Sequence, residues 1–366
     1  MKRRESRVIS VGKVKIGGNN PVVVQGMAKT DTEDVRATVE EIRRLVRAGA
    51  KIVRIAVPTV RAANSVSQIK NQVDVPIVAD IHFNYRIAIE CIDKGVDKVR
   101  INPGNMHKEE ILRVARRAKE AHIPLRIGVN SGSLEENLLR KSLNGERTRG
   151  YREERYRHAV AKAMVESALQ TVRLLEEKNF TDIVVSLKSS DVLTTVLSYQ
   201  LISDKIPYPL HLGITATGPS PQGVIRSSIG VGLLFAQGIG DTLRVSLTDD
   251  SVEEVRVGYQ ILRSLHLSEA GPTLVSCPTC GRCKVNLKSI VKKVFSGIEN
   301  IRFPLTVAVM GCEVNGPGEA KEADIGIACT RGGGVLFKKG KRIKRLKEED
   351  MVDVLLREIK SKASYK

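Results

Sequence analysis

Hydrophobic residues follow two alternating patterns along roughly the first 250 positions of this chain. Short runs rich in β-branched residues are each followed by a longer stretch in which apolar residues return every three or four positions. The short runs are typical of buried strands, and the longer stretches are typical of amphipathic helices. We predict strands at residues 21–25, 51–57, 75–80, 98–101, 125–129, 183–187, 210–214 and 242–247.

Between these strands we predict helices at 32–48, 108–121, 155–178 and 251–265. Strands that alternate with helices in this number and over this length indicate an α/β fold, a (β/α)₈ TIM-type barrel. The alternative is an open, doubly wound sheet, which often has a glycine-rich first turn. No G-x-G-x-x-G follows the first strand, so the barrel is favoured. A basic segment at 135–157 is too long for a plain barrel connection.

The pattern changes near residues 267–272, where a Gly-Pro step ends the helical spacing. Beyond it we predict a helix at 287–295, strands at 305–310 and 324–328, a hairpin and a final helix at 347–360. This order is typical of a small α+β domain. We therefore expect a barrel at 1–266 and a second domain at 267–366.

The chain is strongly basic, with a formal net charge of +19 and a pI of about 9.8. Such a balance favours an acidic partner or substrate, such as a nucleic acid, a phosphorylated small molecule or an acidic electron carrier. Aromatic residues make up 4% of the chain and Trp is absent, which disfavours a single-strand nucleic-acid binder. No apolar run reaches the ~20 residues of a membrane helix, and no apolar stretch follows the basic N-terminus. We expect a cytoplasmic protein that does not bind membranes.

Four predicted strands carry an arginine between aliphatic residues: Arg54, Arg100, Arg126 and Arg244. A charge in such a position needs a partner, and guanidinium groups suit phosphate and carboxylate oxygens. Internal ion pairs, for example with Asp80 or Asp97, are the simpler explanation for any one of them. Four together favour a polyanion pocket at the C-terminal mouth of the barrel. Other polar residues at strand ends are Gln25, Asp80, His82, Asn102, Asn130, Lys188, His211 and Ser246.

Five of the six cysteines follow position 276, which in a reducing compartment indicates metal or redox chemistry. Cys277, Cys280 and Cys283 form a C-x₂-C-x₂-C run, and Cys312 follows in a glycine-rich loop. Zinc would prefer two C-x₂-C pairs, whereas an iron–sulfur cluster accepts this run with a distant further ligand. We favour the cluster and interpret Cys329 and Cys91 as core residues. The basic run at 338–345 is either a solvated hairpin or a docking site for an acidic electron carrier.

Motifs along nearly the whole chain carry a family resemblance. They include Val78-Ala-Asp-Ile-His-Phe83, Val99-Arg-Ile-Asn-Pro-Gly-Asn105, His211-Leu-Gly-Ile-Thr215, Cys277-Pro-Thr-Cys280 and Gly311-Cys-Glu-Val-Asn-Gly-Pro-Gly-Glu319. The chain resembles the 4-hydroxy-3-methylbut-2-enyl diphosphate synthase family of the non-mevalonate isoprenoid pathway. The resemblance implies an oxidoreductase that reductively opens the ring of 2-C-methyl-D-erythritol 2,4-cyclodiphosphate, with loss of water. It also implies a homodimer and electrons that arrive singly from ferredoxin or flavodoxin through a [4Fe–4S] cluster.

The resemblance also assigns residues. It implies Cys277, Cys280, Cys312 and Glu319 as cluster ligands, of which the carboxylate is the weakest ligand and the easiest to vacate. It implies a substrate site built from Arg54, Arg100, Asn102, Arg126, Asn130, Lys188, Arg244 and Ser246. We take Glu319, Lys188, Asp80 and His82 as catalytic candidates.

The chain departs from the family pattern in three places. Ala216 stands where the family has a glutamate that faces the substrate, Cys283 stands where it usually has threonine, and Gly26 and Lys29 replace serine and asparagine. Two alternatives stay open, the first because of the missing glutamate and the second because of the net charge of +19 and the Cys- and Gly-rich loops. One is a family member that binds the substrate with reduced activity, and the other is a metal-stabilised basic module that binds nucleic acid.

Overall fold

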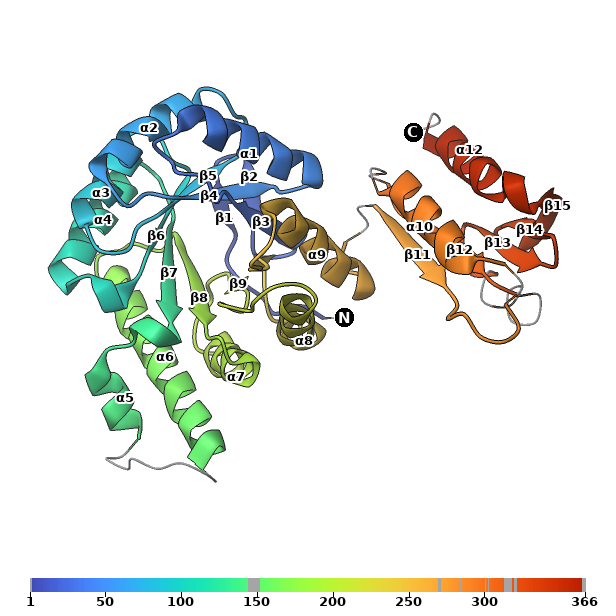
Figure 1. Ribbon diagram of the computed structural model, residues 1–366. Helices are drawn as coiled ribbons and strands as arrows, with labels where there is room; N and C mark the ends of the chain where they lie inside the picture. Colours follow the sequence, from blue (N-terminus) through green and yellow to red (C-terminus); the bar gives the residue numbers. More distant parts are fainter. Residues whose placement is uncertain are drawn as a thin grey trace. The chain divides into compact units, whose positions relative to one another are not determined.

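A closed sheet of eight parallel strands forms the first part of the protein in its computed structural model (Figure 1). The structure describes residues 2–143, 152–268, 271–283, 285–299, 301, 303–312, 318 and 321–363. The strands are β3 (Val23–Met27), β4 (Ile52–Ala56), β5 (Ile77–Asp80), β6 (Lys98–Ile101), β7 (Leu125–Asn130), β8 (Ile183–Lys188), β9 (His211–Leu212) and β10 (Thr242–Leu243). A bridge between Val185 and Leu210 links β8 to the start of β9 and closes the ring. The predicted TIM-type barrel is confirmed.

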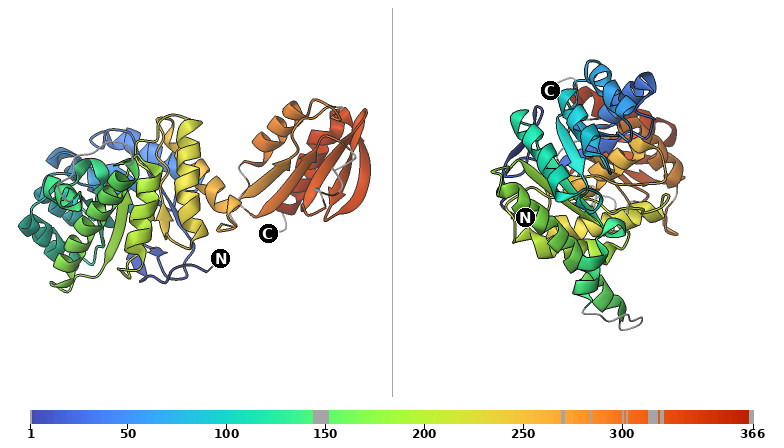
Figure 2. Two further views of the ribbon diagram at one scale, coloured as in Figure 1. Left: turned by 90° about the horizontal axis from the view of Figure 1, so that it is seen from below. Right: turned by 90° about the vertical axis from the view of Figure 1, so that its left-hand side faces the viewer.

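Helices surround this sheet, as Figure 2 shows in two further views. They are α1 (Val35–Ala48), α2 (Val60–Lys70), α3 (Tyr85–Asp93), α4 (Lys108–Glu120), α6 (Arg152–Glu176), α7 (Val192–Ser203), α8 (Gln222–Ala236) and α9 (Ser251–Ser264). The first helix begins three residues later than predicted. Asp34 caps it by accepting a hydrogen bond from the Ala37 N–H, and Thr32 instead donates to the Ala56 carbonyl. Within the predicted insertion at 135–157, the described residues form α5 (Glu136–Ser142) and the start of α6.

A short hairpin precedes the barrel and was not predicted. It consists of β1 (Ile9–Val11) and β2 (Val14–Ile16), which pair antiparallel. Its buried residues pack with Val23, Ile52 and other side chains near the N-terminal ends of the barrel strands. The hairpin therefore closes that end of the barrel and leaves the C-terminal end for the site.

The second unit, Glu269–Lys366, follows Met1–Ser268 and has a core of its own. Its sheet has the order β11 (Pro272–Ser276), β12 (Leu305–Met310), β13 (Ile325–Thr330), β14 (Gly333–Lys338) and β15 (Lys341–Lys347). The first three strands run parallel, and the last two continue antiparallel. Apolar side chains of α10 (Leu287–Ile298) and α12 (Met351–Ala363) share one core with this sheet. Strand β11 was missed by the sequence analysis, because its last residues are exposed rather than buried.

None of the described helices is long and apolar enough to cross a membrane.

Candidate functional site

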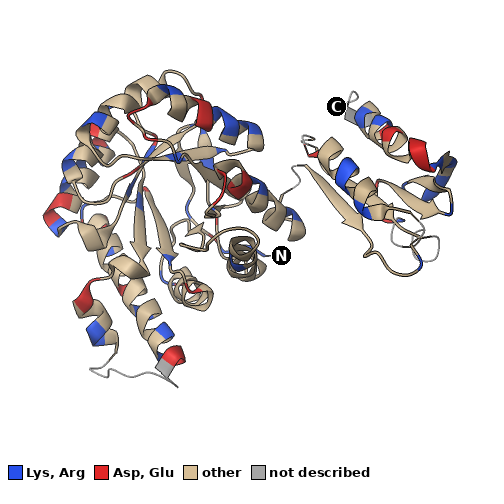
Figure 3. Cartoon of the chain, in the orientation of Figure 1, with Lys and Arg blue, Asp and Glu red and all other residues tan. Residues whose placement is uncertain are grey.

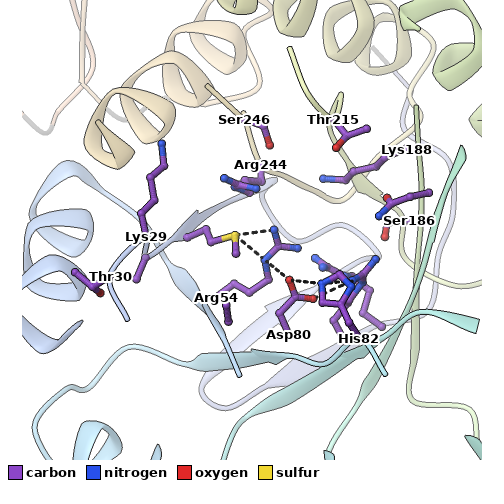
Figure 4. Close-up of a pocket in the computed structure, with 16 residues that line it drawn as sticks. Lys29, Thr30, Arg54, Asp80, His82, Ser186, Lys188, Thr215, Arg244 and Ser246 are labelled. Atoms are coloured by element: carbon purple, nitrogen blue, oxygen red, sulfur yellow. Dashed lines mark hydrogen bonds and ion pairs between the residues drawn. The ribbon is translucent and has the colours of Figure 1, made fainter. Parts of the chain in front are cut away.

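A cavity of about 490 Å³ opens at the C-terminal end of the barrel strands (Figure 4). The predicted residues that line it are Arg54, Asp80, His82, Arg100, Arg126, Asn130, Lys188, Arg244 and Ser246. Parallel pairing explains their convergence, because the register places Asp80 beside Arg100, Arg100 beside Arg126, and Asn130 beside Lys188. Side chains at neighbouring strand ends therefore meet at one mouth.

Asp80 is the central counter-ion of the cavity. Its carboxylate lies 3.1 Å from Arg100 Nη1, 3.7 Å from Arg54 Nε and 3.5 Å from His82 Nε2. Burial by itself would raise the pKa of Asp80, but Arg54, the hydrogen bond with His82 and the other arginines outweigh it. The pKa of Asp80 therefore lies well below its usual value, and the carboxylate is ionised. The ion pair considered from the sequence is present with Asp80, whereas Asp97 pairs with Lys70 instead.

Arg100 bonds to residues of both neighbouring strands, β5 and β7. Its Nη2 donates to the Gly128 carbonyl at 3.0 Å, while its Nη1 reaches Asp80. A Cβ atom at position 128 would collide with the Arg100 guanidinium, so any other residue there would displace this arginine. The glycine in the sequence motif around Arg126 thus makes room for the arginine of the preceding strand.

A second carboxylate, Glu254 of α9, forms an ion pair with Arg244 without itself lining the cavity. Arg244 Nη2 lies 2.9 Å from Glu254 Oε2, the Leu247 N–H donates to Oε1 at 2.9 Å, and Lys29 Nζ lies 3.0 Å from Oε1. Glu254 is only 2% exposed. The sequence analysis missed this residue because an acidic side chain in the first turn of a helix usually faces solvent and favours the helix dipole.

Cations outnumber carboxylates among the described residues that line the cavity. Six cationic side chains line it (Lys29, Arg54, Arg100, Arg126, Lys188 and Arg244) against one carboxylate, Asp80. Burial, followed by repulsion from Arg126 and the other arginines, lowers the pKa of Lys188 well below its usual value. Burial and neighbouring arginines also lower the pKa of Arg126. A multiply charged anion bound in this cavity would offset the repulsion among these cations, so the site favours such a ligand.

A buried polar layer surrounds these cations inside the barrel. Among the described residues, Lys98 Nζ, His211 Nε2 and both amide atoms of Gln25 have no hydrogen-bond partner. Burial and then the charges of Lys188, Arg126 and Lys98 lower the pKa of His211 well below its usual value. Its Nδ1 lies 2.8 Å from Thr242 Oγ1. Gln25 and His211 stood out as strand-end residues, but Lys98 carried no signal in the sequence.

The residues that line the cavity differ in part from the site expected from the sequence. Asn102 is not among the lining residues: it donates to Ser133 Oγ at 2.8 Å and accepts from the Gly104 N–H. Ala216 has a positive φ of 50° in the loop that follows β9, and it presents no titratable group. Lys29, Ser186 and Thr215 line the cavity and were not among the predicted site residues.

Cys277 and Cys312 lie just beyond the C-terminal ends of two neighbouring parallel strands of the second sheet. Cys277 directly follows β11, and Cys312 comes two residues after β12, which runs parallel to β11. The Gly311 N–H donates to Cys277 Sγ at 3.1 Å, as backbone donors do around thiolate ligands. Cys280 is exposed and Cys312 is half-buried. Glu319, the remaining predicted ligand, lies outside the described residues.

The thiol side chains of these described cysteines suit an iron–sulfur cluster in their chemistry. Two features are compatible with thiolate ligation. Cys277 and Cys312 follow neighbouring parallel strands, and the Gly311 N–H donates to the Cys277 sulfur. No three His, Cys, Asp or Glu side chains within the described ranges are already close enough together to hold a metal ion.

Comparison with known proteins covers both units. Residues 6–259 match the GcpE TIM-barrel domain, and residues 273–361 match the GcpE protein C-terminal domain. The chain is 52% identical over 361 residues to the 4-hydroxy-3-methylbut-2-en-1-yl diphosphate synthase (flavodoxin) of Thermodesulfovibrio yellowstonii, covering 98% of this chain and 99% of the relative. It is 53% identical over 358 residues to the enzyme of the same name from Caldanaerobacter subterraneus, covering 98% and 97%. The Geobacter sulfurreducens enzyme of that name is 49% identical over 358 residues, with 98% of each chain covered.

Proposed function

The chain belongs to the GcpE family, and on this premise we propose that its barrel and its cysteine-bearing unit act together in the reaction for which its relatives are named. It is an oxidoreductase of isoprenoid biosynthesis that forms 4-hydroxy-3-methylbut-2-en-1-yl diphosphate. The reaction opens the ring of 2-C-methyl-D-erythritol 2,4-cyclodiphosphate reductively, with loss of water. One observation carries the assignment of the substrate to the barrel: the cation-rich cavity at the strand ends.

The cyclic diphosphate brings two negative phosphates into this cavity. Arg54, Arg100, Arg126 and Arg244 bind and orient their oxygens, and Asn130 and Ser246 supply neutral hydrogen bonds. Asp80 and Glu254 keep Arg100 and Arg244 in place before the substrate arrives. Because these groups are already ordered, little side-chain entropy is lost on binding.

Lys188 is the proton carrier that the cavity offers. Without an anion its pKa is depressed by burial and by neighbouring arginines. Phosphate oxygens offset that repulsion, raise the pKa of Lys188 and so favour proton uptake at Nζ. In the reaction the carbon–oxygen bond to one phosphate breaks, a hydroxyl group leaves as water, and two electrons and one proton are consumed. Lys188 holds that proton, while Asp80 and His82 orient the neighbouring arginines and the substrate.

The cofactor in this proposal is a [4Fe–4S] cluster held by Cys277, Cys280, Cys312 and Glu319. The adjacent strand ends of β11 and β12 support the cysteine assignments. When bound, the cluster supplies single electrons at low potential. The electron donor is flavodoxin or ferredoxin, and the names of the relatives favour flavodoxin.

The test is anaerobic purification followed by assay with the cyclodiphosphate and a strong chemical reductant. We expect a brown protein with iron and sulfide in equal amounts and measurable product. The same assay on Ala216→Glu shows whether the missing glutamate limits the rate, since general acid–base groups contribute typically 10²–10⁴-fold. A colourless protein with stoichiometric zinc, or a brown protein without turnover in both forms, would contradict the proposal.

A further inference from the structure

The sulfur atoms of Cys277 and Cys283 both lie close to Gly311, the residue that follows β12 in the second sheet. A Cβ atom built on Gly311 would lie 2.8 Å from Cys283 Sγ and 3.4 Å from Cys277 Sγ. The Gly311 N–H donates to Cys277. Cys283 is therefore a direct neighbour of a predicted cluster ligand and of the backbone that leads to Cys312.

A tight turn brings Cys283 to this place. Its N–H donates to the Cys280 carbonyl at 2.9 Å, which reverses the chain between the two cysteines. Its thiol donates to the Val285 carbonyl at 3.3 Å, and because a thiol is a weak donor this bond holds the side chain only loosely. The side chain is half-buried and also packs against the apolar core below α10.

The chemistry of iron favours this thiol over a carboxylate. Thiolates are softer ligands than carboxylates and bind cluster iron more strongly. C-x₂-C-x₂-C is a spacing that iron–sulfur proteins use. Cys329 is the contrasting case: it is 1% exposed, belongs to β13 and packs in the core shared with the helices.

We propose that Cys283 is an alternative ligand of the cluster, which can hold the fourth iron in place of Glu319. This inference rests on the proposed function, because it requires a cluster in the second unit. Cys283 thereby protects the cluster from losing an iron while the weaker carboxylate ligand is detached.

The test measures the number of irons per chain and the electron paramagnetic resonance spectrum of the full-length protein after anaerobic reconstitution. Glu319→Ala and Cys283→Ser alone should each keep about four irons per chain, because the other residue still holds the fourth. The double variant should fall to about three and show the signal of a [3Fe–4S] cluster. It should also release iron to a chelator ~10-fold faster than either single variant.

The matched control is Glu319→Ala combined with Cys329→Ala, which should keep the fourth iron. Loss of that iron in Glu319→Ala alone, or its retention in the Glu319→Ala/Cys283→Ser protein, overturns the proposal. Loss in Cys283→Ser alone also overturns it, since Glu319 would then be unable to hold the fourth iron by itself. A wild-type protein without iron overturns the proposed function instead, so the two failures are distinguishable. Circular dichroism of each variant separates iron loss from unfolding.

Discussion

Lys98 carries an amine inside the barrel that finds no hydrogen-bond partner among the described residues. The residue is fully buried on β6. Burial, then Arg126 and Arg54, lower the pKa of Lys98 well below its usual 10.5. A group in this setting costs stability, because the unfolded chain can hold a proton that the folded chain must release.

We predict that Lys98→Met increases the free energy of unfolding by about 2 kcal/mol at pH 7, since it removes an unpaired buried polar group. In the wild type, the unfolded state binds more protons between the folded pKa and 10.5. Stability should therefore rise with pH across that window, and this part of the slope should vanish in the variant. Urea unfolding followed by circular dichroism at several pH values measures both effects. Lys108→Met, an exposed change on α4, is the control; a less stable Lys98→Met protein with the wild-type slope would contradict the prediction.

Glu254 acts through Arg244 and Lys29 rather than on the substrate. We predict that Glu254→Gln raises the KM for the cyclodiphosphate ~10-fold or more, with a smaller change in kcat, because Arg244 loses the charge that orients it. Steady-state kinetics with a chemical reductant measures this split. Glu253→Gln changes the exposed neighbour that pairs with Arg256 and should leave both constants unchanged. Equal effects of the two substitutions would show that Glu254 does not position Arg244.

At the scale of elements, β15 stands out as an exposed basic strand at the edge of the second sheet (Figure 3). Its charged residues are Lys341, Arg342, Lys344, Arg345 and Lys347. Edge strands often carry lysine, which blocks pairing with other chains. The same charges would also attract an acidic electron carrier. Kinetics with the protein donor can distinguish these two roles.

We predict that Lys341→Glu combined with Arg345→Glu raises the KM for flavodoxin ~10-fold at low salt. The effect should shrink as ionic strength rises, because exposed charges are screened. Turnover with a small chemical reductant should not change. An unchanged KM for flavodoxin would leave β15 with the protective role alone.

At the scale of the whole molecule, the substrate cavity and the proposed cluster belong to separate units, Met1–Ser268 and Glu269–Lys366. For turnover, electrons must pass from a cluster in the second unit to a substrate bound in a barrel. The homodimer that the family resemblance implies remains a prediction, and co-expression of two variants can test it.

Mixing two inactive variants tests this arrangement. Lys188→Met impairs the barrel and Cys277→Ser impairs the cluster. If sites form between chains, co-expression of the two should restore about a quarter of the wild-type activity, since half of the dimers are mixed and each has one intact site. Either variant expressed alone is the control. If the mixture stays inactive although mixed dimers form, each site is built within one chain.

The sequence by itself determined the alternation of strands and helices, the arginine-bearing strands and the clustered cysteines. These follow from local rules: a repeat of two residues in strands or of three to four in helices, and a C-x₂-C spacing. Its predicted helix and strand boundaries moved by only a few residues in most elements, for example from 108–121 to Lys108–Glu120 in α4.

Only the tertiary structure decided which side chains meet. Glu254 reaches Arg244 across a loop, Lys98 and His211 share the barrel interior, and Cys283 lies beside Gly311. None of these contacts corresponds to a fixed spacing in the sequence, because each depends on strand register, on closure of the barrel and on burial. The four arginines could be recognised from their aliphatic neighbours. Asp80 was already a candidate counter-ion, but Glu254 and the unpaired amine of Lys98 emerge only when a closed barrel removes them from water, where an unpaired charge becomes costly.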